Sequence, residues 1–177
     1  LPMGPGGTKP NVALSYDSQG GNGILGKGWS LIGRESITRC QAKKPNNVVP
    51  TYTTSDQFCL NGKRLVYVGL STGSRALYRT EVDSGVLVEA MNNNSSLGGP
   101  GYFIVHLENG TKKYFGVDDN SRIESHFGSA LKAWALQRIV PLGSQTINYK
   151  YSESKGTGEY NVSSITWGDY TLNFNYE

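Results

Sequence analysis

The residues with the most suggestive chemical spacing are glycines near the start of the chain. Gly21-x-Gly23-x-x-Gly26 matches a dinucleotide-binding fingerprint, and the same segment extended to Lys27 matches most of a phosphate-binding loop. A working phosphate loop needs a serine or threonine after the lysine to bind Mg²⁺, and Gly28 occupies that position. Both motifs also need a helix whose N-terminus faces the phosphates. Nucleotide binding therefore depends on whether a helix begins directly after the glycines.

The next segment of the chain does not favour a helix. Gly28–Gly33 contains two glycines in six residues, and glycine is among the poorest helix formers. We therefore predict no cofactor here and interpret the stretch as a structural bend or bulge built from Gly23, Gly26 and Gly28. Trp29 is expected to anchor the bend in the core. We expect the glycines to allow a neighbouring strand to approach closely, so that Gly26→Val would destabilise the fold.

Side chains suited to nucleophilic or acid–base catalysis are sparse. The chain has two histidines, His106 in a strand-like run and His126 in a loop-like one. Nothing in the sequence places a serine and an acid beside either of them, as a catalytic triad requires. The paired carboxylates of Asp118 and Asp119 fall in a turn-forming segment. We predict no catalytic residue and no enzyme activity.

Residues able to bind metal ions are also scattered. The cysteines and histidines lie far apart in the sequence and lack the close spacing of zinc ligands. Asp17, Asp118, Asp119 and Asn120 carry oxygen ligands suited to calcium, but their spacing matches no known calcium loop. We predict no metal site.

The two cysteines, Cys40 and Cys59, leave two interpretations open. One pair in a chain of 177 residues is not a disulfide framework, and free cysteines are commonly small buried residues. Two buried free thiols are the preferred interpretation. The alternative is a single disulfide between neighbouring strands.

Composition and charge exclude several classes of protein. The net charge is +3, and the lysines and arginines are scattered, so the sequence carries no electrostatic footprint for nucleic acid. No apolar run approaches the roughly 20 residues that span a bilayer as a helix. Leu1–Pro5 lacks the basic start and apolar stretch of a signal peptide. We expect neither nucleic-acid binding nor a membrane span.

Short strands joined by tight turns dominate the pattern around these residues. Asn61-Gly62 and Asn109-Gly110 each separate two strand-like runs, and Gly168-Asp169 separates a third pair. Asn-Gly is a strong hairpin signal because both positions tolerate a positive φ. The chain has no room for the crossover connections that parallel strands need. We predict an all-β fold of antiparallel, hairpin-rich sheet, shell-like or sandwich-like, forming one domain over 1–177.

Three segments are harder to assign. Ala130–Val140 could suit a helix, but Trp134 begins an alternating pattern that ends at Pro141, and we favour a strand. Gln41–Ser55 and Met91–Gly101 are polar or rich in glycine and proline, and we predict loops.

Tyrosines recur in or beside the predicted strands. Cross-strand packing that stabilises the sheet faces is the simplest interpretation. The alternative is a sugar-stacking platform in a carbohydrate- or cell-surface-binding β-sandwich. The tyrosines concerned are Tyr102, Tyr114, Tyr149, Tyr151, Tyr160, Tyr170 and Tyr176.

Several segments share their pattern with one known family. They are Pro10–Leu31 with its glycine run, Ser36–Cys40, Asp56–Leu65 (DQFCLNGKRL), Tyr78–Asp83 (YRTEVD), and Trp134–Ile139 followed by Ile147–Tyr151. Together they resemble the SpvB-type domain, which occurs in a Salmonella plasmid virulence protein, in B components of insecticidal toxin complexes and in Rhs (YD-repeat) polymorphic toxins. Asn61 replaces the family's usual aspartate, and Pro141–Ser144 departs from its usual turn.

The resemblance implies a non-enzymatic part of a secreted bacterial toxin. In toxin-complex and Rhs proteins such β-sheet regions build a hollow shell around a C-terminal toxic domain. The ADP-ribosylating activity of one branch lies in a separate domain, whose motifs are absent from this sequence. The implied partners are other segments of the same toxin polypeptide or toxin-complex subunits. Because both ends look truncated, we expect a fragment of a larger β assembly that could self-associate through unprotected strand edges.

Overall fold

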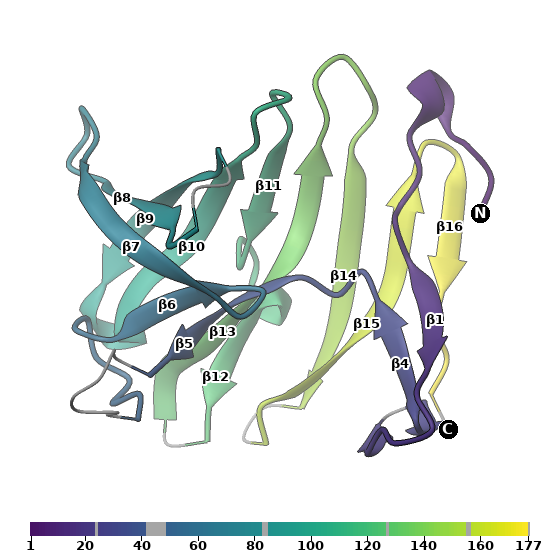
Figure 1. Ribbon diagram of the computed structural model, residues 1–177, viewed down its shortest axis with the longest axis horizontal. Helices are drawn as coiled ribbons and strands as arrows, with labels where there is room; N and C mark the ends of the chain where they lie inside the picture. The colour runs from purple at the N-terminus through teal and green to yellow at the C-terminus, as the bar shows by residue number, and fades with distance from the viewer. Residues whose placement is uncertain (24, 42–48, 83–84, 127, 155–156, 177) are drawn as a thin grey trace.

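The computed structural model describes residues 1–176 except 24, 42–48, 83–84, 127 and 155–156. The predicted all-β, antiparallel fold is confirmed: strands and short turns make up nearly all of the described chain (Figure 1). The helical turns are three 3₁₀ segments, η1 (Pro5–Gly7), η2 (Ser95–Leu97) and η3 (Asp119–Ser121).

Eight strands of the main sheet close into a barrel. Around the ring they are β11 (Lys112–Phe115), β10 (Gly99–His106), β9 (Leu87–Asn94), β8 (Ala76–Thr80), β7 (Lys63–Leu70), β6 (Gln57–Leu60), β5 (Ser36–Cys40) and β13 (Gly128–Val140). Each strand pairs with the next, and the ring closes because β13 pairs with both β5 and β11. Closure gives every strand of the ring a neighbour on both sides, although β7 pairs with β6 only through Lys63 and Arg64 among the described residues.

The long strand β13 belongs both to the barrel and to an open sheet. Its middle, Ala133–Ala135, pairs with β5, and its C-terminal part pairs with β11 on one side and β14 (Ile147–Ser154) on the other. From there the sheet continues outward through β15 (Glu159–Trp167) and ends at the open edge of β16 (Tyr170–Asn173), seen in green to yellow in Figure 1. Strand β12 (Arg122–Ser125) pairs with β13.

The N-terminal glycine segment forms a separate ribbon. Its outer strands β1 (Ala13–Tyr16) and β4 (Trp29–Ile32) pair with each other, and the small strands β2 (Asn22–Gly23) and β3 (Gly26–Lys27) pair at its tip. Just after the ribbon, Arg34 Nη2 donates to the Tyr160 carbonyl of β15 at 3.1 Å, and in Figure 1 the ribbon overlaps the end of the open sheet.

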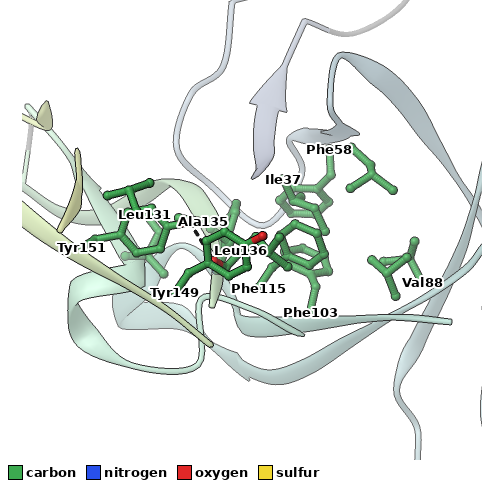
Figure 2. Packing of buried hydrophobic residues seen from close by; sticks show 14 of the residues in the cluster. Ile37, Phe58, Val88, Phe103, Phe115, Leu131, Ala135, Leu136, Tyr149 and Tyr151 are labelled. Atoms are coloured by element: carbon green, nitrogen blue, oxygen red, sulfur yellow. Dashed lines mark hydrogen bonds between the residues drawn. The ribbon is translucent and has the colours of Figure 1, made fainter. Parts of the chain in front are cut away.

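Aromatic side chains fill the barrel. Phe58, Phe103 and Trp134 meet edge to face with ring centroids 5.0 to 5.5 Å apart, and Figure 2 shows Ile37 and Phe115 packed near them. Such contacts add to the stabilisation from burial alone. The predicted strand over Ala130–Val140 is confirmed and supplies the indole at the centre of this cluster.

The predicted loop over Met91–Gly101 is wrong for most of its length. Strand β9 continues to Asn94, β10 begins at Gly99, and these two residues pair. Polar, glycine-rich composition suggested a loop, but the side chains of Asn92 to Asn94 are exposed while the backbone keeps its ladder. In the other predicted loop, Gln41–Ser55, residues 42–48 lie outside the described residues.

Two tyrosines of the predicted sugar-stacking set are buried in the open sheet. Tyr149 and Tyr151 are only 2% and 5% exposed, and Figure 2 shows both against Leu136, whose carbonyl accepts a hydrogen bond from the Tyr151 hydroxyl at 2.6 Å. Burial, with a smaller contribution from Glu35, raises the pKa of Tyr149 to about 12. These two phenols therefore serve packing.

We expect alkaline pH to destabilise the fold through Tyr149. The folded state holds the neutral phenol, so its contribution is complete below pH 10 and is lost as the pH rises from 10 toward 12. A pKa shift of that size corresponds to about 3 kcal/mol in the free energy of unfolding. Urea unfolding at pH 9 and pH 11.5 should show a shallower loss for Tyr149→Phe than for the unchanged chain. Tyr170→Phe, at an exposed position, is the matched control, and equal losses in all three proteins would contradict this account.

Candidate functional site

The glycine stretch is a hairpin between strands. Between β1 and β4 the chain forms the small strands β2 and β3, and a strand rather than a helix begins at Trp29. The geometry that both nucleotide motifs require, a helix N-terminus facing phosphate, does not occur at this stretch. The prediction that Trp29 anchors the bend in the core is wrong. Its side chain is 44% exposed and packs on Tyr16 across the ribbon, with ring centroids 5.1 Å apart.

Two glycines of the ribbon are needed for different physical reasons. Gly26 has φ +97 and nothing within 4 Å of a Cβ placed on it, so its requirement is conformational and the predicted close approach is wrong at this position. Gly28 has φ +79, and its Cβ would lie 2.9 Å from the Tyr16 ring and against the Asp17 carbonyl. The close approach therefore occurs two residues later. Gly23 pairs with Gly26 at the ribbon tip.

Substitution at these two positions should separate the two effects. Gly26→Ala is expected to destabilise the fold by about 1 kcal/mol through backbone strain alone. Gly28→Ala should cost about 3 kcal/mol, because the same strain is joined by steric overlap. Thermal unfolding of the two variants measures the difference. If the two variants lose the same amount of stability, the packing role of Gly28 is contradicted.

Asn61 and Gly62 form the turn between β6 and β7, and both have positive φ, +48 and +79. The Asn61 side chain also reaches outside the hairpin. Its Oδ1 accepts from the Ser36 backbone N–H at 2.9 Å, and its Nδ2 donates to Glu35 at 3.2 Å. Glu35 in turn accepts from Lys113 Nζ at 2.6 and 2.8 Å. An aspartate in place of Asn61 would set a second carboxylate against Glu35, so the amide suits this site.

Cys40 and Cys59 form a disulfide between β5 and β6, and the preferred interpretation of two free thiols is wrong. The strand register places the two residues diagonally across the pair, with Cα atoms 5.9 Å apart. That separation lies in the usual range for a disulfide. Local patterns do not reveal register, and the alternative left open by the sequence is the one that occurs.

We expect removal of this disulfide to weaken the fold. The bridge closes a loop with a sequence separation of 19 residues, which corresponds to about 3 kcal/mol of stabilisation in the chain-entropy model. The double variant Cys40→Ala, Cys59→Ala should unfold at correspondingly lower urea concentration. Dithiothreitol should destabilise the unchanged chain and leave the double variant unaffected. Insensitivity of both proteins would argue that the bridge contributes little.

Sequence reasoning missed a buried ionic site next to this disulfide. The side chains of Arg39 and Asp56 are only 1% and 6% exposed, and Nη1 lies 3.0 Å from Oδ2. Arg39 also donates to the carbonyls of Leu131, Thr53 and Gly98 and lies over the rings of Phe58 and Trp134. It thereby ties β5 to β13, to the segment before β6 and to the turn before β10. One feature of the sequence pointed to this burial: Arg39 lies two residues after Ile37, so both side chains lie on the same face of β5.

Burial disfavours the charged form of both side chains in this pair, and neighbouring groups offset that effect. Burial lowers the pKa of Arg39, and the neighbouring Asp56 carboxylate partly offsets this effect. Burial also raises the pKa of Asp56, but hydrogen bonds from Thr51 and Tyr52 and the charge of Arg39 outweigh it and bring the pKa below its usual value. The site is suited to holding segments of the barrel together, since its donors and acceptors are occupied by protein groups.

Histidines and acids elsewhere assemble no larger cluster in the described part of the chain. His106 Nε2 lies 3.2 Å from Glu89 on the adjacent strand, and Asp118 caps η3 by accepting from Ser121 N at 2.9 Å. The described residues contain no group of three or more histidine, cysteine, aspartate or glutamate side chains able to hold a metal ion. No helix among them has the length and apolar character to cross a membrane.

Comparison with known sequences identifies related proteins. The family described as "Salmonella virulence plasmid 65kDa B protein" (SpvB) matches residues 1–166. The mono(ADP-ribosyl)transferases SpvB of Salmonella typhimurium and Salmonella dublin are 27% identical over 173 residues. The match covers 85% of this chain and 28% of theirs, so the chain spans little more than a quarter of these relatives.

Solved structures share the fold. The N-terminal domain of the effector protein SpvB from Salmonella typhimurium strain LT2 aligns with a TM-score of 0.74 at 22% identity, covering 97% of this chain and 63% of that chain. TcdB2-TccC3 aligns with a TM-score of 0.73 at 19% identity, covering 94% of this chain and 9% of that one. The Photorhabdus luminescens Tc holotoxin pore aligns with a TM-score of 0.70 at 19% identity, covering 90% of this chain and 8% of that one. These likenesses show a shared fold, and the family match over residues 1–166 shows that the chain belongs to the SpvB family.

Proposed function

We propose that the chain is a non-enzymatic scaffold module of a secreted bacterial toxin, forming part of a β-sheet shell around a toxic segment. The observation that carries this proposal is the twelve-stranded sheet, which closes into a filled barrel at one end and stays open at β16 at the other. A filled barrel provides a rigid body, and an open edge can receive a further strand. The family match and the large size of the aligned toxins support a role as one part of a longer wall.

The proposal assigns no transferase activity to this chain. The name mono(ADP-ribosyl)transferase belongs to relatives of which the chain spans 28%, and the Arg39–Asp56 pair and the disulfide serve ion pairing and packing. Incubation of the purified chain with NAD and cell lysate should give no ADP-ribosylated product. A labelled product that appears with the chain and not with buffer would overturn this part of the proposal.

The open edge of β16 provides the test of the shell role. Phe174 N–H donates to the Ser163 carbonyl at 3.0 Å, toward β15. Because backbone groups alternate sides along an antiparallel strand, the N–H groups of Thr171 and Asn173 point to the open edge. Proline at Thr171 therefore removes a donor needed by an incoming strand and leaves the hydrogen bonds to β15 in place.

The experiment is limited proteolysis of the gene product that carries this chain. In that gene product, we expect the segment that pairs with the open edge of β16 to be protected from the protease. Thr171→Pro should make this segment accessible, whereas Thr171→Val, which keeps the N–H, should leave it protected. Circular dichroism spectra of the two variants should coincide, which shows that the chain itself remains folded. Unchanged protection in the folded proline variant would contradict strand addition at this edge.

A further inference from the structure

A polar cavity is lined in part by the β7–β8 hairpin, and Figure 1 shows this hairpin at its upper left. Its volume is about 360 Å³, near the lower end of the range for small-molecule sites. It opens between the hairpin on one side and the paired strands β9 and β10 on the other. None of the residues that line it belongs to the Arg39–Asp56 pair, the disulfide or the ribbon.

Aromatic side chains form one wall of the cavity. The Tyr78 ring is half-buried and meets Phe58 edge to face, with ring centroids 6.0 Å apart. Tyr67 supports it from the neighbouring strand at 5.9 Å. Tyr78 is therefore held in a fixed orientation while part of its surface remains open. A rigid aromatic surface of this kind suits a ligand with one apolar face.

Polar side chains form much of the remaining lining. Thr54, Arg75, Asn92 and Asn93 line the cavity and are exposed. Within the described part of the chain, Arg75, Asn92 and Asn93 have no side-chain hydrogen bond or ion pair to protein. Two amides and a guanidinium offer several donors and two acceptors to a ligand rich in hydroxyl groups.

Backbone strain is concentrated at the same place. Asn92 adopts φ +51 inside strand β9, and Ser74 adopts φ +56 at the rim of the cavity. A glycine would relieve such strain, which costs on the order of 1 kcal/mol for other residues. Asparagine adopts this conformation more readily than most other residues, and here it also places an amide in the lining of the cavity. Half of the positive-φ residues other than glycine in the described chain line this one cavity.

The charge of the lining restricts the ligand. Arg75 is the charged residue among those that line the cavity, and no carboxylate faces it there. A nucleoside triphosphate would need several cations, and an amine would find no anion. A single pyranose ring fits the volume, its hydroxyls match the amides, and its C–H face matches Tyr78. We propose that this cavity binds one acidic sugar residue of the uronic-acid class, with its carboxylate on Arg75.

The proposal is tested by NMR titration of the chain with methyl glucuronide and with methyl glucoside, which differ in the carboxylate. We expect binding of the glucuronide in the millimolar range and about tenfold weaker binding of the glucoside, as loss of a charge-assisted hydrogen bond implies. Arg75→Gln should weaken glucuronide binding about tenfold and leave the glucoside unaffected. Arg79→Gln, an exposed arginine on the same hairpin that does not line the cavity, is the matched control.

Asn92→Gly provides a second variant that separates binding from folding. Glycine accepts the positive φ, so the melting temperature should stay equal or rise while binding of both sugars weakens. Absence of binding by either sugar would overturn the proposal. So would binding that Arg75→Gln and Asn92→Gly leave unchanged, or that Arg79→Gln weakens as strongly as Arg75→Gln.

Discussion

Trp134→Ala is expected to lower the free energy of unfolding by about 4 kcal/mol, within the range for truncation of a fully buried tryptophan. The indole has no exposed surface, lies against Phe58 and Phe103, and is covered on another side by the Arg39 guanidinium, 5.5 Å from the ring centroid. No neighbour can refill that volume without abandoning its own contacts. Urea unfolding followed by circular dichroism measures the loss.

A conservative substitution divides the effect of Trp134 into two parts. Trp134 Nε1 donates to the Pro100 carbonyl at 3.0 Å, which joins β13 to β10 across the barrel. Trp134→Phe keeps an aromatic ring and removes this donor, so we expect a loss of about 1–3 kcal/mol. If alanine and phenylalanine destabilise the fold equally, packing of the indole contributes less than its burial implies.

Arg39→Met is the second substitution with a large expected effect. It should lower the free energy of unfolding by about 3–5 kcal/mol. Methionine fills much of the volume, but Asp56 is left buried without its cation and three carbonyls lose their donor. A cycle with Asp56→Asn tests the coupling. We expect the double variant to be more stable than the sum of the single losses predicts, because the asparagine no longer carries a stranded charge.

Acid should act on the same pair. The pKa of Asp56 lies below its unfolded value, so the stabilisation is present above about pH 4 and is lost as the pH falls through the folded pKa. Asp56→Asn should therefore show a shallower decline in stability between pH 5 and pH 2. Parallel declines in the two proteins would show that other carboxylates dominate acid unfolding.

Local signals predicted much of the fold. The hairpins at Asn61-Gly62 and at Asn109-Gly110 depend on a few adjacent residues, and the strand predicted over Ala130–Val140 follows from alternation. These features are encoded within short windows of sequence, where propensity and period are sufficient.

Features that depend on which face is buried could not be predicted in the same way. Alternation gives the period of a strand but does not say which face points inward. It therefore predicts neither the exposure of Trp29 nor the burial of Arg39. The disulfide required the register of β5 and β6, and the sheet assignment of Asn92–Asn94 required the pairing of β9 with β10. Each depends on a partner strand that the local sequence does not specify.

Barrel closure also has a kinetic consequence. Most ladders of this chain join strands that follow each other directly, and such hairpins form quickly. The ring closes only when β5 meets β13, where Ile37 pairs with Trp134 across about one hundred residues of chain. The entropy of that long loop is lost before the contact is gained. We therefore expect the meeting of β5 and β13 to be the last and slowest step of folding. Until it occurs, the hairpins would present exposed edges to which chaperones and neighbouring chains can bind.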